Sequence, residues 1–285
     1  TGEIRKEAMQ QGQWEYGACV KFFFAGENAG DFLFNFLVGK EFKNGSGIVA
    51  GFKEQLNSAP YSYTNYENRY ISLVSNFNKE NITSLYITAS SNKLKLSGGF
   101  RNYVIANYLY VNEQEVPDQN SSAFTINQLW GRKIFKLGNV YLDNELVFQQ
   151  VPDEAHVNAP PFMDRHQLSF EKALFKRRLK LATGIEVRYN SAYNPAGYDA
   201  LLNKFYYQTK TVSNTPELAL FLNFRIKKFR AFVMGDNLQQ LFSRNTIIYA
   251  GTPVINFNRT GVDYTPVYAA PDALIRFGFT WVLVN

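Results

Sequence analysis

The sequence predicts an all-β fold, an antiparallel transmembrane β-barrel of about 12–14 strands, for three reasons. Apolar and polar residues alternate along most of the chain, and tight turns alternate with long polar loops. Aromatic residues make up 16% of the 285 residues. No apolar run reaches the roughly 18 residues of a helical membrane span. No glycine-rich linker divides the chain, so we expect one barrel domain over residues 1–285.

The expected strands follow from period-two alternation, which places successive side chains on opposite faces of a sheet. They cover residues 13–25, 31–42, a segment beginning at 48, a strand ending at 84–90, and then 94–101, 124–130, 140–150, 166–175, 179–190, 218–226, 229–235 and 273–284.

The segment "LKLATGIEVRYN" (179–190) has the sharpest pattern. Leu181 and Ile185 fall on one parity, while Glu186 and Arg188 fall on the other. A register slip of one residue would move the charged side chains into hydrocarbon. For a basic residue at the bilayer midplane this costs about 2–4 kcal/mol. We therefore expect a strictly specified register, with the leucine parity facing lipid.

The connections are of two kinds that largely alternate. The short ones contain "NGSG", "SSN", "LGN", "KRRL" and "KKFR", which are typical of tight turns. The long ones cover residues 112–122, 151–165, 190–204 and 244–272. Short turns at one end and long loops at the other are typical of outer-membrane barrels. A soluble antiparallel sheet with one solvated face would also alternate, but it gives no reason for this asymmetry of the loops.

Composition excludes or weakens several other classes of protein. The net charge of +6 comes from Lys and Arg spread through strands and turns, without a basic helix or a nucleic-acid-binding module. We therefore expect no nucleic-acid partner. Cys19 is the sole cysteine, so no internal disulfide forms, and its place in a strand indicates a packing role. The first residues lack the pattern of a signal peptide, which indicates a mature protein or a sequence whose beginning is not shown.

Residues with catalytic or metal-binding chemistry are few. His156 and His166 lie in or beside the proline-rich loop, near Asp153, Glu154 and Asp164. Their spacing fits no standard zinc pattern. The chain also lacks the G-x-S-x-G elbow of many serine hydrolases. We therefore expect no enzyme activity, no metal and no cofactor.

Mixed charges lie on the polar parity of several expected strands. We expect the following residues to face the barrel lumen: Glu41, Arg101, Asp143, Glu145, Glu171, Glu186, Arg188, Asn223, Arg225 and Arg276. Such charges in one enclosed space would filter passing solutes. Alternatively, they pair with one another and fill a closed interior, a possibility that Tyr141, Phe221 and Phe232 on the same parity also favour.

Phrases in the C-terminal two-thirds of the chain carry a family resemblance. They include "KLKLSGGFRNY", "LDNELVFQQVPDE", "PPFMDRHQLSFEKALFKRRLKLATGIEVRYNSAYNP", "LFLNFRIKKFRAFVMGDNL" and "RFGFTW". In this order they resemble the putative porin family of outer-membrane β-barrels from Bacteroidota. The resemblance covers residues 94–285 and, more loosely, 61–90. It rests on collinearity, since no single phrase is a catalytic motif.

The resemblance implies an outer-membrane location and a pore. Family members are typically longer than 285 residues, which implies that N-terminal strands are absent from this chain. The chain ends in "LVN" where a terminal aromatic residue is common in outer-membrane barrels. Phe277, Phe279 and Trp281 would then serve in barrel assembly.

Pattern and resemblance together predict an outer-membrane porin through which small solutes or ions diffuse passively. The alternative is a non-conducting barrel that forms part of a larger outer-membrane assembly for secretion, insertion or uptake. The expected partners are outer-membrane lipid and, in the alternative, other outer-membrane or periplasmic proteins.

Overall fold

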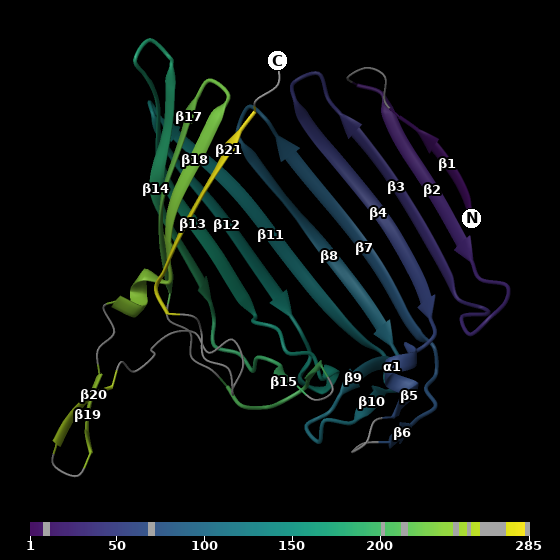
Figure 1. The fold of residues 1–285 in the computed structure, drawn as a ribbon. Helices are drawn as coiled ribbons and strands as arrows, with labels where there is room; N and C mark the ends of the chain where they lie inside the picture. The colour runs from purple at the N-terminus through teal and green to yellow at the C-terminus, as the bar shows by residue number, and fades with distance from the viewer. Residues whose placement is uncertain are drawn as a thin grey trace. The chain divides into compact units, whose positions relative to one another are not determined.

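A computed structural model describes residues 1–7, 12–67, 72–200, 203–211, 216–241, 245–249, 252–256 and 272–282. Its main element is an antiparallel sheet of 13 strands (Figure 1). In sheet order these are β1 (Gly2–Lys6), β2 (Trp14–Phe22), β3 (Phe32–Glu41), β4 (Ser46–Asn57), β7 (Glu80–Ser91), β8 (Leu96–Ala106), β11 (Phe124–Leu137), β12 (Val140–Gln150), β13 (Phe162–Leu174), β14 (Leu179–Asn190), β17 (Glu217–Ile226), β18 (Phe229–Asp236) and β21 (Leu274–Trp281). The predicted all-β fold and strand number are confirmed.

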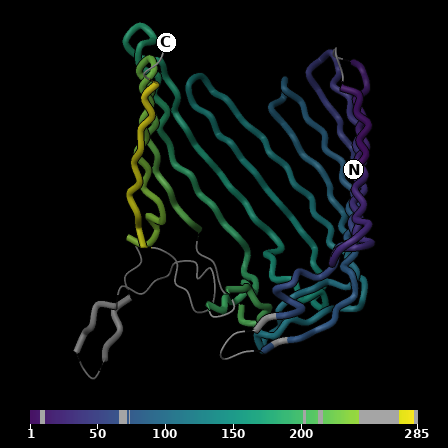
Figure 2. Tube along the Cα trace, turned by 45° about the vertical axis from the view of Figure 1, so that its right-hand side comes forward, coloured from purple at the N-terminus to yellow at the C-terminus, as the bar shows by residue number. Residues whose placement is uncertain are grey.

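The chain divides into two compact units. Unit 1 contains residues 1–131, 147–161 and 196–209, and unit 2 contains residues 132–146, 162–195 and 210–285. Figure 2 traces β1 beside β2 in unit 1 and β21 beside β18 in unit 2. The expectation of a single domain over residues 1–285 stays a prediction.

The long loops contain small elements of their own. These are the hairpins β5 (Asn65–Glu67) with β6 (Ser72–Val74), β9 (Tyr108–Val111) with β10 (Pro117–Asn120), β15 (Gly197–Asp199) with β16 (Lys204–Tyr206), and β19 (Asn245–Tyr249) with β20 (Thr252–Asn256). Short helices are α1 (Tyr61–Thr64), η1 (Asp153–Ala155) and η2 (Leu238–Leu241). Period-two patterning predicted none of these hairpins or helices.

From β2 to β21, short and long connections alternate along the sheet. The short turns are residues 42–45, 92–95, 138–139, 175–178 and 227–228, and the long loops are 23–31, 58–79, 107–123, 151–161, 191–216 and 237–273. Because neighbouring strands are antiparallel, the short turns of each unit lie at one end of its strands and the long loops at the other. This is the asymmetry predicted from the sequence.

Several expected boundaries were wrong. Leu94 and Lys95 were expected in a strand but lie in a turn, where Lys95 has a φ of 48°. Arg165 was expected in a long loop, whereas β13 begins at Phe162 because its pairing with β14 extends to Met163 opposite Asn190. Strand β1 was not expected at all.

In unit 1, the buried apolar side chains lie near the long loops. Ile105, Phe124 and Ala155 form a cluster at the long-loop end. Large apolar side chains along the strands are exposed instead, among them Leu85 with 55% of its surface and Ile87 with 45%. A soluble protein rarely exposes so many large apolar groups together.

In unit 2, strand register separates two faces. Leu168, Ile185 and Leu220 lie directly opposite one another on β13, β14 and β17, as do Leu222 and Val233 on β17 and β18. The alternate positions carry the charged and polar side chains. The face parity predicted for residues 179–190 and 218–226 therefore describes the structure of these strands.

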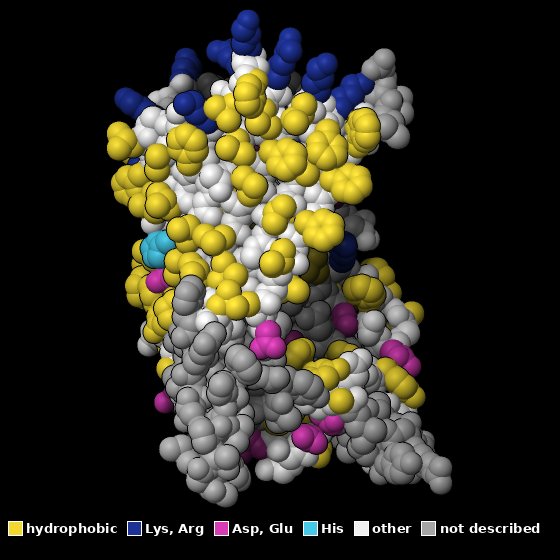
Figure 3. All heavy atoms as spheres, turned by 60° about the vertical axis from the view of Figure 1, so that its left-hand side comes forward, with side chains coloured by type: hydrophobic (Ala, Val, Ile, Leu, Met, Phe, Trp, Pro, Cys, Tyr) yellow, Lys and Arg dark blue, Asp and Glu magenta, His cyan; other side chains and the backbone are white. Residues whose placement is uncertain are grey.

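Hydrophobic side chains form a band on the face drawn in Figure 3, and Lys and Arg side chains gather at one end of it. This pattern is typical of an outer-membrane barrel, whose apolar band meets lipid and whose charged groups meet water or head groups. None of the helices in the described ranges is both long and apolar enough to cross a membrane.

Close packing explains why two adjacent glycines, Gly98 and Gly99, occur in the sequence "LSGGF". A Cβ added at Gly99 would lie 2.4 Å from the carbonyl oxygen of Ile87 and 3.0 Å from Nε1 of Trp130. At Gly98 it would lie 3.0 Å from the carbonyl oxygen of Trp130. The glycines therefore allow strand and indole to approach closely.

We expect Gly99→Ala to lower the free energy of unfolding by about 1–3 kcal/mol, because backbone must shift to admit the methyl group. Urea unfolding in lipid vesicles, followed by tryptophan fluorescence, measures the change. Gly131→Ala is the matched control, since its Cβ would meet nothing closer than the Ser97 oxygen at 4.0 Å. Equal stability of the two variants would contradict the packing role of Gly99.

Candidate functional site

The polar face of unit 2 carries most of the residues expected in a lumen. Arg165 lies opposite Arg188, and Glu171, Ala182, Asn223 and Phe232 follow one another across four strands. Ion pairs or strand register place further predicted residues on this face: Asp143, Glu145, Glu186, Arg188, Arg225 and Arg276. That the face borders a lumen stays a prediction.

An ion-pair ladder crosses four strands of this face. Arg132 on β11 donates two hydrogen bonds to Asp143 on β12, at 2.9 and 2.6 Å. Arg165 on β13 is the centre of the ladder. Its guanidinium lies 3.8 Å from Asp143, 3.3 Å from Glu145 and 3.2 Å from Glu186. One arginine thus holds carboxylates from both neighbouring strands.

The ladder ends on β14, where Arg188 pairs with the other oxygen of Glu186. The Glu186 side chain is only 8% exposed, whereas that of Arg188 is 52% exposed. A buried carboxylate loses hydration, and at Glu186 the guanidinium groups of Arg165 and Arg188 take the place of water. The ladder contains three arginines and three acids, so its charges balance. That the predicted residues fill a closed interior stays a prediction.

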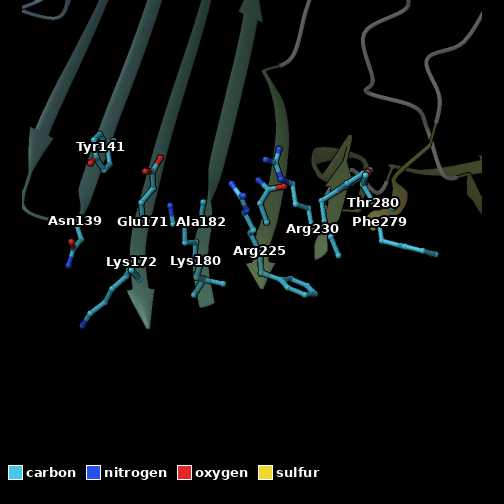
Figure 4. Close-up of a pocket in the computed structure, with 17 residues that line it drawn as sticks. Asn139, Tyr141, Glu171, Lys172, Lys180, Ala182, Arg225, Arg230, Phe279 and Thr280 are labelled. Carbon is cyan, nitrogen blue, oxygen red and sulfur yellow. The ribbon is translucent and has the colours of Figure 1, made fainter. Parts of the chain in front are cut away.

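A second polar feature is a cavity of about 720 Å³ near the short turns of unit 2 (Figure 4). The predicted residues Glu171, Asn223 and Arg225 line it. Lys180 and Arg230 line it as well, although neither was among the predicted site residues.

The aromatic ring of Phe232 also contributes to the wall of this cavity. A Cβ added at Gly278 on the neighbouring strand would lie 2.6 Å from that ring. The glycine therefore leaves room for the ring on the polar face.

The remaining predicted lumen residues belong to neither the ion-pair ladder nor the cavity. Arg276 on β21 pairs with Asp236 on β18. Arg101 lies 6.0 Å from the centre of the Tyr86 ring, and Glu41 ends β3; both belong to unit 1. The structure therefore brings some of the predicted residues together and leaves Arg276, Arg101 and Glu41 apart from the ladder and the cavity.

The predicted assembly aromatics lie on the apolar face of β21. Phe277, Phe279 and Trp281 are 78%, 70% and 63% exposed, opposite Val233, Ala231 and Phe229 of β18. The rings of Phe229 and Trp281 meet edge to face with centres 6.1 Å apart. A role in assembly stays a prediction.

The two histidines belong to different units. His156 stacks on Tyr110 with ring centres 4.7 Å apart and meets Tyr207 edge-on at 5.0 Å. Burial, followed by the nearby Asp118 carboxylate, raises the pKa of Tyr110 to about 12, so its hydroxyl stays neutral. His166 Nδ1 lies 2.7 Å from Asn144 Oδ1. Searched over the described ranges alone, the chain has no group of three metal-ligating side chains.

The ladder and the cavity contain cations that the predicted set omitted, namely Arg132, Arg165, Lys172, Lys180 and Arg230. Parity alone could have found Lys180, which alternates with lipid-facing leucines. Arg165 could not be found in this way, because its strand was expected to begin one residue after it.

Fold and face chemistry together define an outer-membrane β-barrel protein, with lipid against the apolar face. Over residues 1–285 the sequence matches the family model described as putative porin, and the chain belongs to this family. The resemblance inferred from the C-terminal phrases is therefore confirmed and extends over the whole chain. A comparison with curated proteins gives no significant match.

Similar solved structures include two receptors and a transporter. The ferric enterobactin receptor PfeA of Pseudomonas aeruginosa has a TM-score of 0.61 and 11% identity; the alignment covers 95% of this chain and 43% of the PfeA chain. The copper transporter OprC has a TM-score of 0.61 and 14% identity, covering 97% and 46%. The siderophore receptor PirA of Acinetobacter baumannii has a TM-score of 0.58 and 10% identity, covering 93% and 43%.

These likenesses show the fold. The chain spans less than half the length of each of these proteins. The predicted location in the bacterial outer membrane is confirmed by the family and by the barrel structures together.

We expect Arg165→Gln to destabilise the protein by about 1–3 kcal/mol, because Glu145 and Glu186 lose a charged donor. Equilibrium unfolding in lipid vesicles measures this loss. Arg178→Gln, in the turn between β13 and β14, removes the same charge outside the ladder and should change stability by less than about 0.5 kcal/mol. Equal effects of the two substitutions would show that the ladder does not stabilise the fold.

Proposed function

We propose that this protein lets small solutes or ions diffuse across the outer membrane along the polar face of its strands. The observation that supports this most is the charged ladder, whose strands carry apolar side chains on their opposite face. Membership of the putative porin family also supports it. Transport, rather than catalysis, is the proposed activity.

The exposure of the ladder favours a water-filled path. The side chains of Arg132, Glu145 and Arg188 are 45%, 41% and 52% exposed. Charged groups that are half exposed need water around them, because an apolar environment would penalise the charged form. Paired charges along such a path create a transverse field that acts on every passing solute.

A second candidate is a non-conducting barrel that forms part of a larger outer-membrane assembly. The bulky side chains on the polar face favour it, among them Tyr141 and Phe232, which line the cavity, and Phe221, which packs over Gly184. The hairpins in the long loops would then supply contact surface for other outer-membrane or periplasmic proteins.

Conductance of the purified protein in a planar lipid bilayer separates the two candidates. A porin should give discrete conductance steps. Arg225→Gln should raise the permeability ratio of K⁺ over Cl⁻ by about twofold, because a positive charge near the path is removed. Arg178→Gln, in a turn, is the control and should leave the ratio nearly unchanged.

A well-folded protein without any conductance, with or without Arg225→Gln, would reject the pore. The assembly role would then take its place, and partners that co-purify from detergent-solubilised outer membranes would be sought.

A further inference from the structure

Three cations lie side by side on the polar face, close to the short turns of unit 2. Lys180 on β14 is directly opposite Arg225 on β17, and Arg225 is directly opposite Arg230 on β18. Like charges in directly opposite positions of a sheet are destabilising. The row therefore weakens the fold unless something else compensates its charge.

Acidic side chains of the described ranges do not provide this compensation. Each arginine of the ladder pairs with a carboxylate, but no ion pair within 4.0 Å joins Lys180, Arg225 or Arg230 to a described acid. Arg225 donates a hydrogen bond from Nε to the backbone oxygen of Lys227, at 3.0 Å. This contact orients the guanidinium without neutralising it.

The row forms part of the wall of the 720 Å³ cavity, whose size suits a small ligand. Figure 4 labels all three cations together with Thr280 and Tyr141 among the side chains that line it. Glu171 is the one acidic side chain among the lining residues, against the three cations of the row; Lys172 also lines the cavity but lies opposite Leu181, on the other parity. The cavity thus combines excess positive charge with hydroxyl donors.

We propose that this cavity binds a phosphate-type oxyanion, either free or as part of a small solute, through Lys180, Arg225 and Arg230. Guanidinium groups match phosphate oxygens with paired N–H donors, and lysine adds a compact positive charge. The bound anion supplies the negative charge that the row lacks. The inference rests on the proposed function in one respect, since water and solutes must reach the polar face.

The phosphate group could also belong to a lipid head group. Register favours a solute, because the residues that flank the row, among them Leu181, Phe224 and Phe279, alternate with it and belong to the apolar face of the sheet. The row therefore lies on the face opposite the one that lipid covers. An experiment with separate solute and lipid arms distinguishes the two sources.

The test measures binding of inorganic phosphate and pyrophosphate to the purified protein in an uncharged detergent, by isothermal titration calorimetry. Lys180→Gln, Arg225→Gln and Arg230→Gln should each weaken binding about tenfold, the effect of losing one charge-assisted hydrogen bond. The triple variant should bind neither anion measurably. Circular dichroism confirms that each variant keeps its strand content.

The matched control is the triple variant Lys176→Gln, Arg177→Gln and Arg178→Gln. It removes the same charge from the adjacent turn, at the same end of the strands, and should bind phosphate as the unmodified protein does. Equal losses in both triple variants would show non-specific attraction and would overturn the site. Unchanged phosphate binding in the triple variant of Lys180, Arg225 and Arg230 would overturn the site as well.

Lipid is the last arm of the test. Adding phosphatidylglycerol to the micelles should leave phosphate binding unchanged. If the lipid displaced phosphate completely, the site would bind a lipid head group and the solute proposal would be overturned. Because binding in detergent requires no conduction, specific binding without conductance would reject the pore and keep the site. Conductance without phosphate binding would reject the site and keep the pore.

Discussion

The period-two alternation of the strands imposes the constraint on which the rest of this structure depends. Each strand of unit 2 presents apolar side chains on one face and polar ones on the other, and direct cross-strand pairing continues both faces from strand to strand. Leu220 and Phe277, both on the apolar face, are 45% and 78% exposed. Such a sheet is stable only where its two faces meet different solvents.

The polar face handles its charge in two different ways. The ladder centred on Arg165 balances each arginine with carboxylates, and burial of Glu186 makes that pairing necessary. The row of Lys180, Arg225 and Arg230 lacks such partners among the described acids, although it begins on the same strand, β14, and continues across β17 and β18. A paired network and an uncompensated row on one face indicate different roles, stabilisation for the first and recognition for the second.

Much of the fold could be predicted from the sequence, because its strands are long and strongly patterned. The parity of residues 179–190 needed no tertiary information, since any slip would place Glu186 or Arg188 in hydrocarbon. Strand β1 could not be predicted, because "GEIRK" is short and mostly polar. The hairpins within the long loops were missed because their strands have only three to five residues, too few for a period to show.

The site was harder to predict than the fold. Parity gave the face of Arg225, but the row that it forms with Arg230 depends on a two-residue turn at 227–228 that sets the register. Arg165 was missed because the loop before β13 is rich in proline and polar residues up to that position. The pairing of a cation with an acid depends on how far side chains reach across strands. Neither the period-two alternation nor the composition of the sequence contains this information.

A cysteine scan along β14 and β17 in lipid vesicles tests the central claim most directly. After Cys19→Ser removes the background thiol, each variant is treated with a water-soluble maleimide. The account predicts that Glu186→Cys and Asn223→Cys react, while the neighbouring Ile185→Cys and Leu222→Cys are shielded by lipid. Reaction that ignores parity along both strands would contradict it.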